Sequence, residues 1–179
     1  MIEADFLDSL NETLEPEGAR HEPGEVFETP RLEVLGYYPR RVQLAPIPLV
    51  GRGTGVVIVV RQPLDVEGNA KGLETLLGRA AMALNGRYPP WRSWVVGMAA
   101  VILTAEPITP QDDDLLKQAM ALTLPPRRVL STGLFRINLG QEAVAFAVTQ
   151  GQGGPFGEPE ILADAFSKQF RRFVPLIDV

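Results

Sequence analysis

A glycine-rich segment, Gly151 to Gly157, has the residue types that come closest to a known chemical use. It follows an expected strand and precedes an expected helix, a context in which backbone N–H groups bind phosphate. Its spacing is GxGxxxG instead of the GxGxxG of dinucleotide sites, and no Lys-Ser or Lys-Thr pair follows it as in a P-loop. Glu158 and Glu160 add negative charge where a phosphate would lie. We therefore interpret the segment as a surface loop without a bound nucleotide.

A second candidate for ligand binding is the pair Arg136 and Asn138. Both lie on one face of an expected strand, opposite Phe135, Ile137 and Leu139. An arginine beside a cleft can hold a carboxylate or a phosphate, although a solvated face of an antiparallel sheet is the more ordinary interpretation. The candidate ligand-binding residues are Arg136, Asn138, Gly151, Gly153, Gly154 and Gly157.

Catalytic and metal-binding residues are scarce in this sequence. It has no cysteine, which excludes disulfides, cysteine-ligated metals and thiol catalysis, and its one histidine, His21, lies in a segment rich in proline and glycine. Three successive acids, at positions 112–114, are interpreted as the solvated start of a helix, because adjacent residues point in different directions around it. We expect no catalytic residue, no metal and no cofactor.

The acidic residues are concentrated near the N-terminus. The chain of 179 residues has a net charge of −5, and residues 1–30 hold nine acids and a single base, Arg20. We interpret this part as a solvated helix and linker, with an interaction arm as the alternative. The net charge argues against a nucleic-acid partner. Three arginine pairs can form an anion-binding patch if they converge, and they are Arg40-Arg41, Arg127-Arg128 and Arg171-Arg172.

Hydrophobic periodicity predicts four helices and six strands. The first helix has an apolar stripe in which every fourth residue is apolar, and the glycine-rich stretch 51–55 is interpreted as a tight turn. Pro39 is expected to separate the first two strands, while Asn69 or Asp65 caps the second helix and Gly86 follows its end. The expected helices are 2–14, 72–85, 110–122 and 159–173, and the expected strands are 31–38, 41–50, 56–61, 94–104, 134–139 and 142–149.

This order predicts an α+β fold of two layers, a mixed and mostly antiparallel sheet with amphipathic helices packed on it. A three-layer α/β fold is the alternative. We divide the chain into an acidic N-terminal helix and linker, residues 1–30, and a single α+β domain, residues 31–179. Val56 to Val60 and Trp94 to Leu103, within two of the expected strands, carry no polar side chain, so we expect both of their faces to be buried.

The sequence shows neither a signal peptide nor an apolar segment of the ~20 residues that a membrane-spanning helix needs, so we expect a cytoplasmic protein without membrane contact. The order of helix, strands, helix, strands and final helix resembles that of small acidic secretion chaperones, from which the helix at 110–122 departs. That resemblance implies a protein that binds or assembles other proteins.

Two functions are therefore expected. The first is a non-catalytic binding or assembly protein, chaperone- or adaptor-like, that acts as a homodimer and has a protein partner. The alternative is a small enzyme or ligand-binding domain that holds an anionic ligand with the loop at 151–157 and Arg136. A pocket lined by Arg136, Asn138 and the loop would favour the second function, and a flat surface with a large apolar patch would favour the first.

Overall fold

A six-stranded sheet forms the centre of the computed structural model, which describes residues 1–23, 27, 32–44, 52–123, 126, 128–149 and 156–172. The strands lie in the order in which they follow one another in the sequence. The central strands β2, β3 and β4 are parallel, while β1 and β5 run antiparallel to their neighbours and the short β6 is parallel to β5. The strands are β1 (Glu33–Gln43), β2 (Arg52–Arg61), β3 (Val95–Leu103), β4 (Val129–Asn138), β5 (Ala143–Val148) and β6 (Arg171–Arg172).

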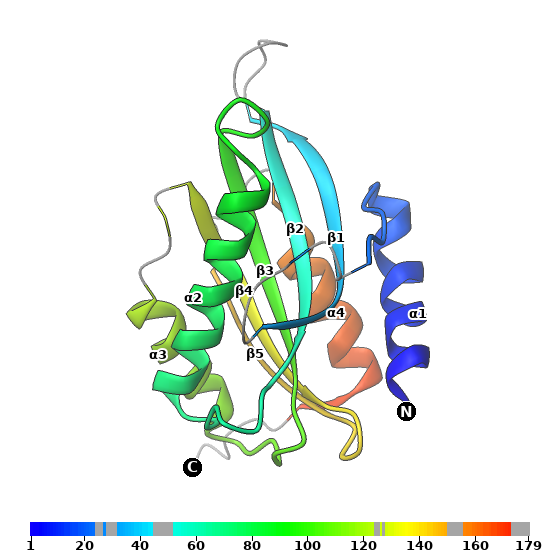
Figure 1. Ribbon diagram of the computed structural model, residues 1–179. Helices are drawn as coiled ribbons and strands as arrows, with labels where there is room; N and C mark the ends of the chain where they lie inside the picture. The colour runs from blue at the N-terminus through cyan, green and yellow to red at the C-terminus, as the bar shows by residue number, and fades with distance from the viewer. Residues whose placement is uncertain are drawn as a thin grey trace, which may run out of the picture.

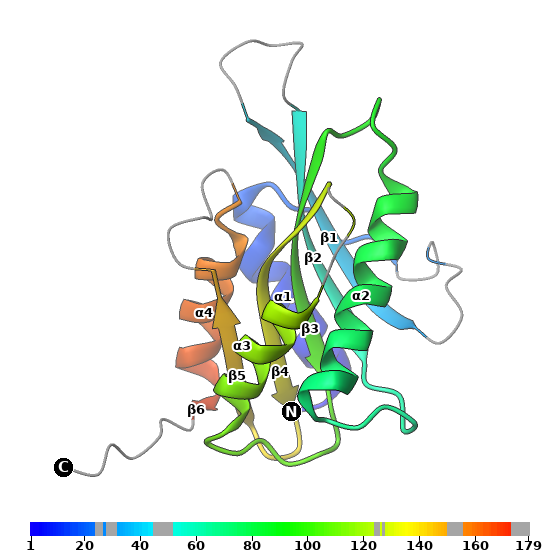
Figure 2. The same cartoon turned by 90° about the vertical axis from the view of Figure 1, so that its left-hand side faces the viewer.

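Helices cover both faces of this sheet (Figures 1 and 2). The helices α2 (Ala70–Arg87) and α3 (Asp112–Leu122) connect successive parallel strands and lie on the same face of the sheet. Crossover connections between parallel strands share one hand, and both of these connections proceed in the same direction across the sheet, so both helices lie on one side. The helices α1 (Glu3–Leu14) and α4 (Glu158–Gln169) cover the other face. The α+β class with a mixed sheet is confirmed. The pairs β1–β2 and β4–β5 are antiparallel, as expected, whereas β2, β3 and β4 are parallel to one another. Because helices lie on both faces of the sheet, the fold has three layers, as in the alternative α/β prediction, instead of two.

Two apolar layers form the core, one on each face of the sheet. Because β2 and β3 are covered on both sides, the expected burial of both their faces is confirmed. In α1 the expected stripe is buried at Phe6, Leu10 and Leu14, whereas Ile2 is 66% exposed. The ring of Phe6 lies 5.9 Å from that of Phe166, so α1 packs on α4 as well as on the sheet.

Pro39 does not end the first strand, as the sequence had predicted, because β1 continues through it to Gln43. The strand lies at the edge of the sheet, and a proline is tolerated where its missing N–H would point away from the neighbouring strand. The carbonyl of Pro39 accepts the backbone N–H of Arg20 at 3.4 Å on that outer side. Residues 45–50 of the second expected strand lie outside the described residues.

The predicted tight turn at 51–55 is wrong from residue 52 onward, since β2 begins at Arg52. The glycines there allow close approach instead of chain reversal. A Cβ atom at Gly55 would lie 2.3 Å from Oε1 of Glu158, and one at Gly97 in β3 would lie 2.5 Å from the ring of Phe156. The absence of side chains at these positions therefore lets the start of α4 pack directly on the strands.

The termini of the second helix were partly predicted. Asn69 caps α2, because its Oδ1 accepts the backbone N–H of Gly72 at 2.9 Å. Gly86 does not follow the helix, which continues to Arg87. Among the described residues, α2 and the other helices are too short or too polar to cross a bilayer.

Candidate functional site

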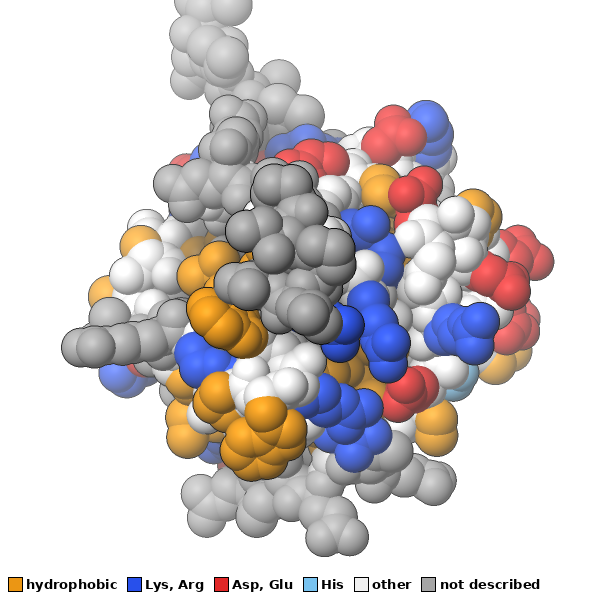
Figure 3. Space-filling view, turned by 90° about the horizontal axis from the view of Figure 1, so that it is seen from above, with side chains coloured by type: hydrophobic (Ala, Val, Ile, Leu, Met, Phe, Trp, Pro, Cys, Tyr) orange, Lys and Arg blue, Asp and Glu red, His pale blue; other side chains and the backbone are white. Residues whose placement is uncertain are grey.

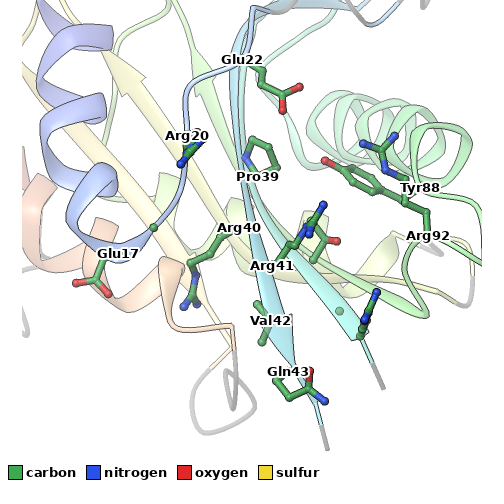
Figure 4. A pocket seen from close by; sticks show the side chains of 14 residues that line it. Glu17, Arg20, Glu22, Pro39, Arg40, Arg41, Val42, Gln43, Tyr88 and Arg92 are labelled. Carbon is green, nitrogen blue, oxygen red and sulfur yellow. The ribbon is translucent and has the colours of Figure 1, made fainter. Parts of the chain in front are cut away.

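A groove of about 850 Å³ lies against the edge strand β1, where β1 ends and β2 begins (Figure 4). We call it the arginine groove, because five of the described residues that line it are arginines and two are acids. The acids are Glu17 and Glu22, and the arginines are Arg20, Arg40, Arg41, Arg52 and Arg92.

Strand pairing brings these arginines together from separate parts of the sequence. Arg41 pairs with Thr54 and Gln43 with Arg52, so Arg41 and Arg52 are diagonal neighbours on the face that carries α2. Arg40 leaves β1 on the opposite face, and Figure 4 shows Arg41 directed toward the side where Tyr88 and Arg92 lie.

The segments beside β1 and β2 position the other two arginines. Arg92 belongs to the connection between α2 and β3, which is tied to β2 because the N–H of Trp94 donates to the carbonyl of Arg52 at 2.9 Å. The guanidinium of Arg128 donates to the carbonyls of Tyr88, Ser93 and Trp94, so it holds this connection in place. Arg20 follows α1 and its backbone binds Pro39.

Most of the groove's positive charge has no acidic counterpart in the described part of the chain. Arg40 is the exception, since its Nε lies 2.5 Å from Oε1 of the buried Glu158. Within the described residues, no carboxylate lies within 4 Å of the guanidinium groups of the other four, all of them exposed, namely Arg20, Arg41, Arg52 and Arg92. Because guanidinium groups repel one another, an anion in the groove would lower the energy of the arrangement.

Tyr88 and Glu22 line the groove toward α2. The hydroxyl of Tyr37 donates to Glu22, whose carboxylate lies 3.7 Å from Arg87. Burial is the main cause that raises the pKa of Tyr37, and the hydrogen bond to Glu22 raises it further. Burial also raises the pKa of Tyr88. Phenols with an ordinary pKa of about 10 are already protonated near neutral pH, and these shifts move both groups further from ionisation. The guanidinium of Arg92 lies 5.5 Å from the ring centre of Tyr88, a cation–π contact.

Exposed aromatic side chains adjoin the groove. Trp91 is 87% exposed and Trp94 is 58% exposed, on either side of Arg92 in sequence. Figure 3 shows blue basic side chains gathered at this end of the molecule, with orange apolar side chains next to them. The arrangement supplies guanidinium donors and flat apolar surface, which suit the binding of an anionic partner.

The structure places Arg136 and Asn138 together, but away from solvent. Arg136 is 2% exposed and its guanidinium forms ion pairs with Asp112 and Glu106. Asn138 donates to the carbonyls of Ala105 and Glu106 at 3.2 and 2.9 Å. Both side chains thus bind the connection between β3 and α3, and the expected solvated sheet face is a buried polar layer instead.

Gly157 does not lie beside Arg136 and Asn138. Gly157 precedes α4, whose first residues pack on the opposite face of the sheet from Arg136. The other glycines of the candidate site, Gly151, Gly153 and Gly154, lie outside the described residues, so a ligand-binding role for the loop stays a prediction.

The prediction of a solvated acidic cap at 112–114 is wrong for two of its three residues. Asp112 is 1% exposed and Asp113 is 9% exposed. Asp112 accepts the backbone N–H of Thr109 at 2.8 Å, as the third residue of a capping box does, and Asp113 accepts that of Phe146 at 3.0 Å. Buried carboxylates of this kind are retained because hydrogen bonds and arginines compensate them.

The described members of the three arginine pairs do not converge on one site. Arg40-Arg41 lines the groove, whereas Arg128 binds backbone carbonyls and Arg172 binds Asp113 at 3.1 Å. Arg127 lies outside the described residues. Sequence reasoning noticed Arg40-Arg41 but missed the groove, because the β1–β2 register brings Arg52 beside Arg41 and the connection between α2 and β3 brings Arg92 there.

Comparison with known proteins yields no match to a family model, to a curated protein or to a solved structure. The function must therefore be inferred from the geometry of the chain itself.

Proposed function

We propose that this chain is a non-catalytic binding protein that holds an anionic partner in the arginine groove. The observation that carries the proposal is the group of four exposed arginines, Arg20, Arg41, Arg52 and Arg92, which have no carboxylate within 4 Å among the described residues. Elsewhere in the same chain, exposed and buried arginines do pair with acids, as Arg61 and Arg136 show.

The composition of the chain makes this grouping informative. Acids outnumber bases by five, so there are enough carboxylates to neutralise every arginine, and yet only two of the described residues that line the groove are acids. The planar guanidinium group binds carboxylate and phosphate through paired hydrogen bonds, and several such groups around one groove favour a partner with several negative charges.

The wall of the groove supports binding rather than catalysis. The phenol of Tyr88 is protonated near neutral pH, as an unperturbed phenol with a pKa of about 10 already is, and burial raises its pKa further, while Glu22 already accepts a hydrogen bond from Tyr37. These groups can orient a partner, but they are poorly suited to remove a proton from it.

Binding of fluorescently labelled poly-L-glutamate, measured by anisotropy, tests the proposal. We expect saturable binding that weakens as salt is raised, since exposed charges are screened. The double variant Arg41→Glu/Arg52→Glu should lose most of the affinity, while a single Arg171→Glu, an exposed arginine on β6 outside the groove, should lose little. Equal affinity of the groove variant and the wild type would contradict the proposal.

The homodimer and the cytoplasmic location stay predictions. The chain's own helices cover both faces of the sheet, so a dimer would have to bury other surface. The exposed apolar residues that a dimer could still bury include Met82, Trp91, Trp94 and Leu130. Light scattering at tens of micromolar (an order-of-magnitude choice) decides the matter, because a mass of 19.6 kDa there identifies a monomer.

A further inference from the structure

The outer edge of β1 is only partly covered by the chain. Glu22 and Tyr37 form an antiparallel bridge in which each backbone N–H donates to the other residue's carbonyl, at 2.8 and 3.1 Å. Two residues along, the N–H of Arg20 donates to the carbonyl of Pro39. This edge thus already accepts an antiparallel strand from its own chain.

The next backbone groups along this edge have no partner among the residues that the structure describes. In an antiparallel pair, successive residues direct their N–H and C=O alternately to either side. Tyr37 directs its N–H and C=O to the outer side, and Pro39 directs its C=O there. Arg41, two residues further along, therefore directs its N–H and C=O outward as well. Among the residues that the structure describes, no backbone group binds the outward N–H and C=O of Arg41.

A turn explains why the covering segment stops there. Gly18 has a φ of 82° and follows the short helix at 15–17, so the chain leaves the edge between Arg20 and α1. Only glycine adopts this left-handed conformation without strain. Gly18 lines the arginine groove together with residues Pro39 to Gln43, so the groove lies beside the outward backbone groups of Arg41.

Resting on the proposed function above, we propose that the partner is an extended acidic segment of another protein, which adds to β1 as an antiparallel strand at Arg41. Side chains of a strand alternate between its two faces. Every second residue of the bound segment would therefore face the side that carries Arg41, Arg52 and Arg92, and carboxylates at these alternate positions would bind the three guanidinium groups.

The chemistry of the edge favours a polypeptide over a nucleic acid. A free N–H and a free C=O on one residue are complementary to another backbone, which supplies both an acceptor and a donor in strand register. A phosphate group offers acceptors only, so it can bind the N–H of Arg41 but not its C=O.

The test uses four labelled probes and fluorescence anisotropy with the full-length protein. The first is an octapeptide of alternating Glu and Val. The second has the same sequence with backbone N-methyl groups on the edge that would face β1. The third has the same composition with its acids contiguous, and the fourth is single-stranded oligothymidine. The protein variants are Arg41→Glu/Arg52→Glu and the control Arg171→Glu, all checked for folding by circular dichroism.

We expect the alternating peptide to bind most tightly and N-methylation to weaken its binding by about tenfold or more, since it removes backbone donors without changing charge. Hydrogen exchange of the Arg41 amide should slow in the complex, and the groove variant should lose binding while the control keeps it.

Equal binding of the parent and N-methylated peptides would overturn the strand addition and leave the anion-binding function standing. Tighter binding of oligothymidine than of the alternating peptide would overturn it in favour of a nucleic acid. Failure of every probe would overturn both proposals.

Discussion

Replacement of Arg136 by methionine removes the central cation of a buried polar layer between the sheet and α3. The Arg136 side chain is 3% exposed and that of Asp112 is 2% exposed, while Glu106, its second partner, is 46% exposed. Methionine fills most of the volume of the arginine stem, so the change tests the charge more than the packing.

The expected loss follows from these exposures. Removing one partner of a buried ion pair typically costs ~3–5 kcal/mol, because the other charge stays buried, whereas the half-exposed contact with Glu106 adds only ~0–1 kcal/mol. Asp112 retains two hydrogen bonds from Thr109, at 2.8 and 2.7 Å, which moderate the penalty. We therefore expect Arg136→Met to lower the free energy of unfolding by about 3 kcal/mol.

Urea unfolding followed by circular dichroism measures this loss. The matched control is Lys117→Met, which removes an exposed ion pair with Asp114 on α3 and should cost only ~0.2–0.5 kcal/mol. In the Arg136→Met background, Asp112→Asn should recover ~1 kcal/mol or more, because it removes the stranded charge and keeps an acceptor for Thr109. A loss for Arg136→Met no larger than the control's would refute the assignment of this ion pair as stabilising.

Two further predictions concern stability. Phe6→Ala should lower the free energy of unfolding by ~3–5 kcal/mol, since Phe6 is fully buried. Glu3→Ala breaks an exposed ion pair with Arg61 and should cost only ~0–1 kcal/mol. A larger loss for Glu3→Ala than for Phe6→Ala would mean that charge holds α1 in place. Burial raises the pKa of Tyr38 to about 12, so the unfolded chain loses this proton first and the free energy of unfolding should fall as the pH rises from ~10 to about 12. Tyr38→Phe should make that fall shallower in urea titrations at successive pH values, and an unchanged slope would contradict it.

The elements were predictable where a local pattern decides the outcome. The apolar stripe of α1 and the cap at Asn69 depend on neighbours within four residues, and the structure has both. The continuation of β1 through Pro39 was not predictable, because a proline is compatible with an edge strand and incompatible with a central one. The sequence does not reveal which strand becomes the edge.

The candidate site was less predictable for the same physical reason. The neighbours of Arg41 come from β2 and from the connection after α2, and only the strand register makes Arg52 its diagonal neighbour. The acids at 112–114 looked solvated because the residue that compensates Asp112, Arg136, lies 24 positions further along the chain. Long-range pairing therefore determined both the charges that are exposed and those that are buried.

The division of the helices between the two faces bears on how the chain folds during synthesis. The elements from β1 to β5 can assemble with α2 and α3 on one face as soon as they have been translated. The other face needs α1, which precedes the sheet, together with α4, which follows it, and Phe6 contacts both Phe166 and Phe170. On the ribosome, the apolar stripe of α1 therefore cannot be fully buried until α4 has been synthesised, and aggregation competes with folding during that interval.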